Sequence, residues 1–204
     1  MNVVRAGDEL PQDFSSGYVI PVYKPCGWTS HDVVAKVRRR VKPAKIGHAG
    51  TLDPLADGLL ILCTGKATKL VAKLQELKKT YSAVYRFGAT TATDDADAPE
   101  TQICDASHLT RDQIQAALDR LTGEILQRPP AFSALKKNGK RAYELARKGL
   151  DPELQPRPVT IYRHQIVEFV SGERVRVVVE CSKGTYIRAL ARDAGEILGV
   201  GGYL

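Results

Sequence analysis

The stretch Gly47-His48-Ala49-Gly50-Thr51-Leu52-Asp53-Pro54-Leu55-Ala56-Asp57-Gly58 has the least ordinary composition in the chain. Because residues 45–57 are dense in glycine, threonine, aspartate and proline, we expect an ordered loop there rather than a helix or strand. Pro54 biases Asp53 away from helical geometry, and the flanking glycines permit close approach of a ligand backbone. Such a loop can hold the Asp53 carboxylate out into a cleft. The alternative is an Asx-turn, in which the carboxylate only accepts from nearby backbone amides.

Short apolar strands and amphipathic helices follow one another on both sides of this loop. Before it, a helix should begin at Thr29 or Ser30, with Asp32 completing a capping box, and end before Pro43. Hydrophobic periodicity predicts strands over 18–23, 58–63, 80–87 and 174–181, and helices over 66–77, from Thr110 onward and over 187–198. Irregularly placed helices among antiparallel-looking strands favour an α/β (α+β) fold with a mixed, mostly antiparallel sheet flanked by helices.

Composition indicates an ordinary soluble protein, because 43% of the 204 residues are hydrophobic and 26% are charged. We expect a loose leader over 1–17 and one domain over 18–204 that carries an insertion. No stretch is apolar enough for a membrane span or a signal peptide, which predicts a cytoplasmic protein without a membrane partner. The four cysteines are scattered and have no histidines at metal-ligand spacing, so we expect buried free thiols and no metal.

Positive charge is concentrated in one segment of a chain whose net charge is +7. Between 128 and 148, Phe132 and Tyr143 are interleaved with seven cations that face only Glu144. The cations are Arg128, Lys136, Lys137, Lys140, Arg141, Arg147 and Lys148. Cations that neutralise phosphates release counterions and gain affinity, so we predict a nucleic-acid-binding arm over about 128–150.

Several collinear motifs resemble those of the TruB family of pseudouridine synthases. The loop from Lys45 to Gly58 matches K-x-G-H-x-G-T-L-D-P-x-A-x-G, and residues 65–69 match the G-x-A-T-K that follows it. Similar matches are K-P-x-G-x-T-S at 24–30, K-T-Y at 79–81, R-P-P-x-x-S-A-L-K at 128–136 together with 139–147, and C-S-K-G-T-Y-I-R at 181–188. The matches extend from about Tyr18 to Tyr203.

The resemblance implies the pseudouridine synthase fold and a cofactor-free, metal-free isomerisation of uridine to pseudouridine in RNA. Moving a base from an N- to a C-glycosidic bond involves no redox change, which agrees with the lack of a dinucleotide or P-loop motif. The catalytic residues that it implies are Asp53, Tyr81 and Arg188, and the substrate-binding residues are Lys24, His48, Tyr186, Phe132 and Lys136. Arg188 would pair with Asp53 and keep that carboxylate ionised. For each of these residues a purely structural role remains the alternative.

Two features set this chain apart from the family pattern. Asp57 stands where many members have threonine, and Ala98 stands where they have glycine. The family normally continues beyond Leu204 with a C-terminal RNA-binding extension, which we expect to be absent here.

The resemblance favours a stand-alone, monomeric enzyme acting on the T-loop uridine of tRNA, position 55, without an obligate protein partner. The arm motif beginning at Arg128 resembles the bacterial branch. A guide-RNA-dependent synthase is one alternative. An RNA-binding or RNA-folding module without catalysis is the other.

Overall fold

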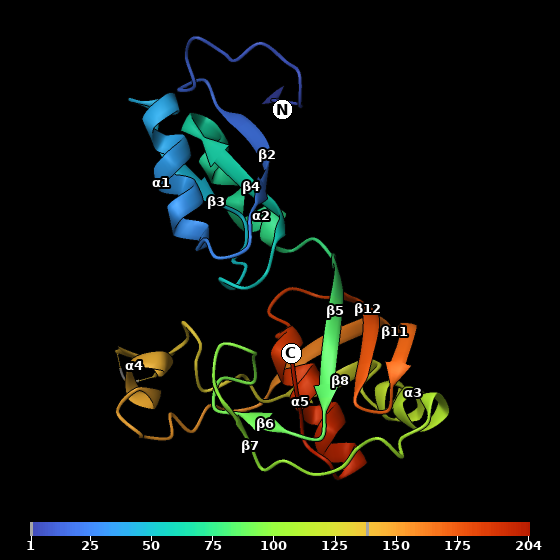
Figure 1. Cartoon of the computed structure of the whole chain (residues 1–204). Coiled ribbons are helices and arrows are strands. Elements are labelled where there is room, and N and C mark those ends of the chain that lie inside the picture. Colours follow the sequence, from blue (N-terminus) through green and yellow to red (C-terminus); the bar gives the residue numbers. More distant parts are fainter. Residues whose placement is uncertain (1, 138) are drawn as a thin grey trace. The chain divides into compact units, whose positions relative to one another are not determined.

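The computed structural model describes residues 2–137 and 139–204, and the chain forms two compact units, Met1–Leu77 and Lys78–Leu204 (Figure 1). The expectation of buried thiols is confirmed for Cys63 and Cys181 and wrong for Cys26 and Cys104, which are exposed. That residues 18–204 act as a single catalytic domain stays a prediction.

The first unit is a four-stranded sheet with helices on both faces. Its elements are β1 (Asn2–Val3), β2 (Tyr18–Lys24), α1 (Ser30–Val41), β3 (Ile46–His48), β4 (Gly58–Thr64), η1 (Gly65–Leu70) and α2 (Val71–Gln75). The strand order is β1-β2-β4-β3; β1 is parallel to β2 and the other neighbours are antiparallel. One face packs on α1, and the other packs on η1 and α2.

The expected α1 is confirmed together with its cap. The Thr29 side chain accepts from the backbone N–H of Asp32, and the Asp32 carboxylate accepts from the backbone N–H of Thr29, which is a complete capping box. Val33, Val34 and Val41 are buried against the sheet, as their helical spacing predicts.

Two local predictions in this unit were wrong. The segment 45–57 is not loop throughout, because β3 pairs with β4 and the loop begins after His48. The segment 66–77 is not one helix: a 3-10 turn leads into the short α2, and Leu77 is exposed although Leu70 and Leu74 pack as expected. The turn starts directly at the end of β4, where the Gly65 N–H is bound to the Lys45 carbonyl at 2.7 Å.

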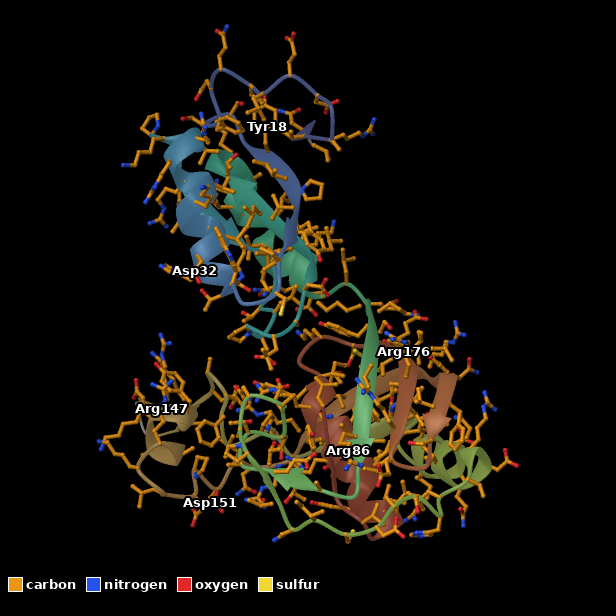
Figure 2. The ribbon with its side chains drawn as sticks, in the orientation of Figure 1. Tyr18, Asp32, Arg86, Arg147, Asp151 and Arg176 are labelled. Carbon is orange, nitrogen blue, oxygen red and sulfur yellow. The ribbon has the colours of Figure 1, made fainter. Side chains whose placement is uncertain are left out.

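The second unit is built on a five-stranded antiparallel sheet in the order β13-β5-β12-β11-β8. Its sheet and helix elements are β5 (Lys79–Phe87), α3 (Arg111–Asp119), β8 (Gly123–Gln127), β11 (Arg157–Ser171), β12 (Arg174–Cys181), α5 (Ile187–Leu198) and β13 (Gly202–Tyr203). Helices α3 and α5 cover one face and enclose the main core. The other face is polar, and Figure 2 shows Arg86 and Arg176 on its strands.

The expected alternation over β5 and β12 is confirmed, because Tyr85, Phe87 and Val177 are fully buried. The fold class, a mostly antiparallel sheet flanked by helices, is confirmed as well. The 15-residue β11 was missed. Its register shifts three times, which breaks the period of two that identifies a strand, and Pro158 argued against a paired strand.

The expected arm projects from the second unit (Figure 1). It contains β9 (Lys136–Lys137), β10 (Lys140–Arg141) and α4 (Ala142–Ala146), and a separate small hairpin is formed by β6 (Thr90–Thr91) and β7 (Glu100–Thr101). In the part of the chain that the structure describes, no helix is long and apolar enough to cross a membrane.

Candidate active site

Asp53 lies in the loop that joins β3 to β4 in the first unit. The loop turns at this residue, since the Asp53 carbonyl accepts from the Ala56 N–H at 3.1 Å. The residue is partly exposed, so a ligand can reach it.

Lys24, at the end of β2, holds the chain immediately after Asp53. Its side chain is 0% exposed, and its ammonium donates to the carbonyls of Pro25, Trp28 and Pro54 at 3.0, 2.6 and 3.3 Å. A buried ammonium is stable only when its protons are bound, and three acceptors match its three donors. Lys24 therefore fixes the Pro54 carbonyl; its direct contact with a substrate stays a prediction.

Gly27 and Ser30 also form hydrogen bonds with the backbone on either side of Asp53. The Gly27 N–H donates to the Pro54 carbonyl at 2.8 Å. On the other side of Asp53, the buried Ser30 hydroxyl accepts from the Leu52 N–H at 3.0 Å and lies 3.3 Å from the Leu52 carbonyl, to which it donates. The residues before and after Asp53 are thus both bound by the segment 24–30.

His48 and Asp57 lie at the two ends of the same loop. Nδ1 of His48 donates to the Gly50 carbonyl, because a carbonyl oxygen can only accept. The Tyr23 hydroxyl donates to the Asp57 carboxylate, and this hydrogen bond raises the pKa of Tyr23. The departure from threonine at 57 is thus matched by a hydroxyl donor at 23. That His48 contacts RNA stays a prediction.

Arg188, in the first turn of α5, is the central cation of the second unit. It is 7% exposed, and its guanidinium donates to the carbonyls of Thr93 and Phe132 at 2.9 and 3.2 Å. Its Nε lies 3.9 Å from the carboxylate of the buried Asp95. The alternative of a solvated arginine at a helix start is wrong for this residue.

Sequence reasoning assigned no role to Asp95 or to Arg192, one turn further along α5. Arg192 donates to Asp94 at 2.9 Å and to the Arg128 carbonyl at 2.8 Å. Burial raises the pKa values of Asp94 and of Asp193, although the Arg192 guanidinium opposes both shifts. The signal available beforehand was the T-x-T-x-D spacing around residue 95.

Tyr81 and Tyr186 are both partly buried in the second unit. Tyr81 lies on β5 opposite Val179 and packs at the margin of the core. Tyr186 immediately precedes α5, and its backbone N–H and C=O are bound by the side chain of Gln127, a residue that the motifs did not single out.

Six of the predicted cations are exposed: Arg128, Lys136, Lys140, Arg141, Arg147 and Lys148. Lys136 is exposed and pairs with Arg141 across the β9–β10 hairpin, and Phe132 lies partly buried at the base of the arm. The guanidinium carbons of Arg141 and Arg147 lie 5.9 and 5.4 Å from the centre of the Tyr143 ring. Figure 2 shows Arg147 on this arm. An aromatic ring flanked by cations suits a phosphate backbone with accessible bases.

The structure thus brings the predicted residues together in two groups. Lys24 and His48 lie with the Asp53 loop in the first unit, and Arg188 contacts the arm at Phe132 in the second. The pairing of Asp53 with Arg188 joins residues of different units and stays a prediction. Among the residues that the structure describes, no three histidine, cysteine or acidic side chains are grouped as metal ligands.

Comparison with known proteins first identifies the class. A chain in the "Crystal Structure of a Cbf5-Nop10-Gar1 Complex" is similar with a TM-score of 0.68 and 32% identity over 93% of this chain and 46% of that one. A chain in "Structure of H/ACA RNP bound to a substrate RNA containing 2'-deoxyuridine" has a TM-score of 0.64 and 29% identity over 91% and 44%. The chain has the pseudouridine synthase fold. Residues 38–187 match the family model "TruB family pseudouridylate synthase (N terminal domain)", and the chain belongs to that family.

Curated relatives carry the name "tRNA pseudouridine synthase B". The protein of Paenarthrobacter aurescens (strain TC1) is 50% identical over 93% of this chain and 62% of its own length. Those of Arthrobacter sp. (strain FB24) and Mycobacterium tuberculosis (strain ATCC 25618 / H37Rv) are 52% and 46% identical over 93% and 91% of this chain, and 63% of each relative is covered. The chain therefore spans less than two thirds of these relatives' length.

Proposed function

We propose that this chain isomerises uridine to pseudouridine in the T loop of tRNA, as a stand-alone enzyme without a cofactor. The observation that carries the proposal is that the loop of Asp53 is hydrogen-bonded on both sides of this residue. Lys24 and Gly27 bind the carbonyl after it, and Ser30 binds both backbone groups of the residue before it. A reactive side chain needs such a rigid mount, because small displacements at a reacting centre cost large factors in rate.

The chemistry assigned to the site needs one carboxylate, one cation and one aromatic ring. Asp53 would act on the glycosidic carbon or the uracil ring, as carboxylates act in glycoside chemistry. Arg188 would pair with Asp53, since an adjacent guanidinium stabilises a carboxylate. Tyr81 would stack on the base and exchange a proton near C5.

The basic arm would supply the energy for presenting the base. Removing a uridine from its stack costs on the order of a few kcal/mol, and stacking on one aromatic ring returns about 1 to 3 kcal/mol. Phosphate contacts by exposed cations of the arm, such as Lys136, Lys140 and Arg147, would supply the remainder. Recognition would depend mainly on the shape of the RNA loop.

The test is incubation of the full chain with unmodified tRNA and no other factor, followed by mapping of pseudouridine. We expect product at the T-loop uridine with the wild type, none with Asp53→Asn, and none with a tRNA in which that uridine is cytidine. Lack of product with a folded wild type, or equal product with Asp53→Asn, would refute the proposal.

Two other functions are separated by the same assay. A guide-dependent synthase would be inactive until a guide ribonucleoprotein is added; the two similar solved structures are described as a Cbf5 complex and an H/ACA RNP. The 46 to 52% identity to relatives named for tRNA favours the stand-alone form. An RNA-binding module without catalysis would bind tRNA equally well before and after Asp53→Asn and give no product with either.

A further inference from the structure

Gln127 is a buried amide that the motifs of the chain do not single out. It is the last residue of β8, it is 2% exposed, and it directly precedes the arm. Its Oε1 accepts from the Tyr186 N–H at 2.8 Å, and its Nε2 donates to the Tyr186 carbonyl at 3.1 Å. One side chain therefore binds both backbone groups of one residue, 59 positions away, and the Tyr186 carbonyl also accepts from the Leu190 N–H at 3.2 Å.

This contact supplies one half of a capping box from outside the helix, namely the acceptor for the backbone N–H of the N-cap residue. Tyr186 is the N-cap of α5, and no side-chain cap hydrogen bond is formed there, in contrast to the capping boxes of α1 and α3. The N-cap residue sets the direction in which the helix leaves its loop. The position of the first turn of α5 therefore depends on Gln127.

The two hydrogen bonds from Gln127 act as a clamp on the backbone of Tyr186. Arg188 lies in the first turn of α5, two residues beyond Tyr186. Its guanidinium is aimed by backbone acceptors, the carbonyls of Thr93 and Phe132, which a shifted helix start would no longer meet. Arg192 binds the carbonyl of Arg128, the residue after Gln127. The start of the arm and the start of α5 are thus tied together at several points.

We propose that Gln127 is a positioning residue for the reaction, which fixes the N-terminus of α5 so that Arg188 meets its partners. The inference rests on the proposed function. Displacing a catalytic group by about 1 Å can cost on the order of 100-fold in rate, so loss of the clamp should lower kcat far more than it changes KM.

The test uses two substitutions of similar size. Gln127→Met removes both hydrogen bonds, and we expect kcat on tRNA to fall about 10- to 100-fold with KM within about 3-fold of wild type. Gln127→Glu restores both bonds only when the new carboxyl is neutral, because an ionised carboxylate cannot donate to the Tyr186 carbonyl. Burial raises the pKa of a carboxyl, so the ratio of its kcat to that of wild type should fall about 10-fold or more between pH 5.5 and pH 8.

Gln115 offers a matched control in the same unit. Its amide also binds two backbone groups, the His164 carbonyl and the Ile166 N–H, each at 3.0 Å, but it joins α3 to β11. We expect Gln115→Met and Gln115→Glu to lower stability while their kcat ratios stay near wild type at every pH.

Two outcomes would overturn the inference. One is a kcat within about 2-fold of wild type for folded Gln127→Met. The other is a Gln127→Glu ratio that does not change with pH, and this second variant still decides the matter if the methionine variant does not fold. If the wild type proves inactive, the proposed function fails, and the clamp is judged by hydrogen exchange of the Tyr186 amide. That exchange must be faster in Gln127→Met but not in Gln115→Met.

Discussion

Acidification should destabilise the second unit through His164, which lies on β11 in its core. The ring is buried, and its Nε2 is bound to the Tyr85 hydroxyl at 3.0 Å. Burial lowers the pKa of His164 from 6.5 to about 4. The unfolded chain therefore binds a proton between pH 6.5 and pH 4 that the folded chain excludes, and stability falls as the pH falls through this window.

The magnitude follows from the size of the shift. A difference of about 2.5 pKa units corresponds to about 3 kcal/mol over the whole window, of which about 2 kcal/mol is lost by pH 5. Above pH 6.5 the histidine is neutral in both the folded and the unfolded state. Its contribution to the free energy of unfolding therefore has its full value there and does not change with pH. Below pH 4 it is charged in both states, and the loss is complete.

Urea unfolding followed by circular dichroism at pH 7.5, 6.5, 5.5 and 5.0 measures the effect. His164→Gln keeps a hydrogen-bonding side chain but cannot titrate, so its stability should fall by about 2 kcal/mol less than that of wild type over this range. The carboxyls whose pKa values burial raises, Asp94 and Asp193, are present in both proteins and cancel in the difference. Parallel pH profiles, or a His164 pKa near 6.5 in an NMR titration of the wild type, would refute the reasoning.

Four substitutions test other parts of the structure. Lys24→Met removes the ammonium from three carbonyls, of which that of Pro54 keeps the Gly27 N–H, and should cost on the order of 3 kcal/mol in urea unfolding; an unchanged stability would contradict the role of Lys24 as a buried donor. Ser30→Ala should lower kcat on tRNA about 10-fold with KM unchanged, because it frees the backbone before Asp53, whereas a change confined to KM would argue for a substrate contact. Gly195→Ala places a Cβ 2.2 Å from the backbone of the following loop and should destabilise by about 3 kcal/mol; an unchanged melting temperature would mean that the loop can move away. Arg147→Glu on the arm should weaken tRNA binding and lower the slope of log K against log salt by about 1, and an unchanged slope would remove it from the phosphate contacts.

The elements that the sequence predicted are those whose signals are local. The capping box at Thr29, the alternation along β12 and the apolar stripe of α5 each lie within a dozen residues, and the structure confirms all three. β11 could not be read in this way, because its bulges interrupt the alternation, and β3 is too short to show a period. The hydrophobic pattern identifies a helix or a strand only where its period is unbroken.

The candidate-site residues show the same contrast between local sequence signals and contacts remote in sequence. Motifs identified Asp53 and Arg188 by resemblance, whereas the backbone near each of them is bound by a polar side chain remote in sequence. Ser30 reaches across 22 positions to Leu52, and Gln127 reaches across 59 to Tyr186. Neither contact leaves a periodic signal. Ser30 stood out in the sequence only as a possible helix start and as a residue of the 24–30 motif, and Gln127 belonged to no motif. The two contacts are alike, because in each a single side chain binds both the N–H and the C=O of one residue. If such clamps fix the reactive side chains, substitutions at Ser30 and Gln127 must change turnover before they change RNA affinity, which separates them from the cations of the arm.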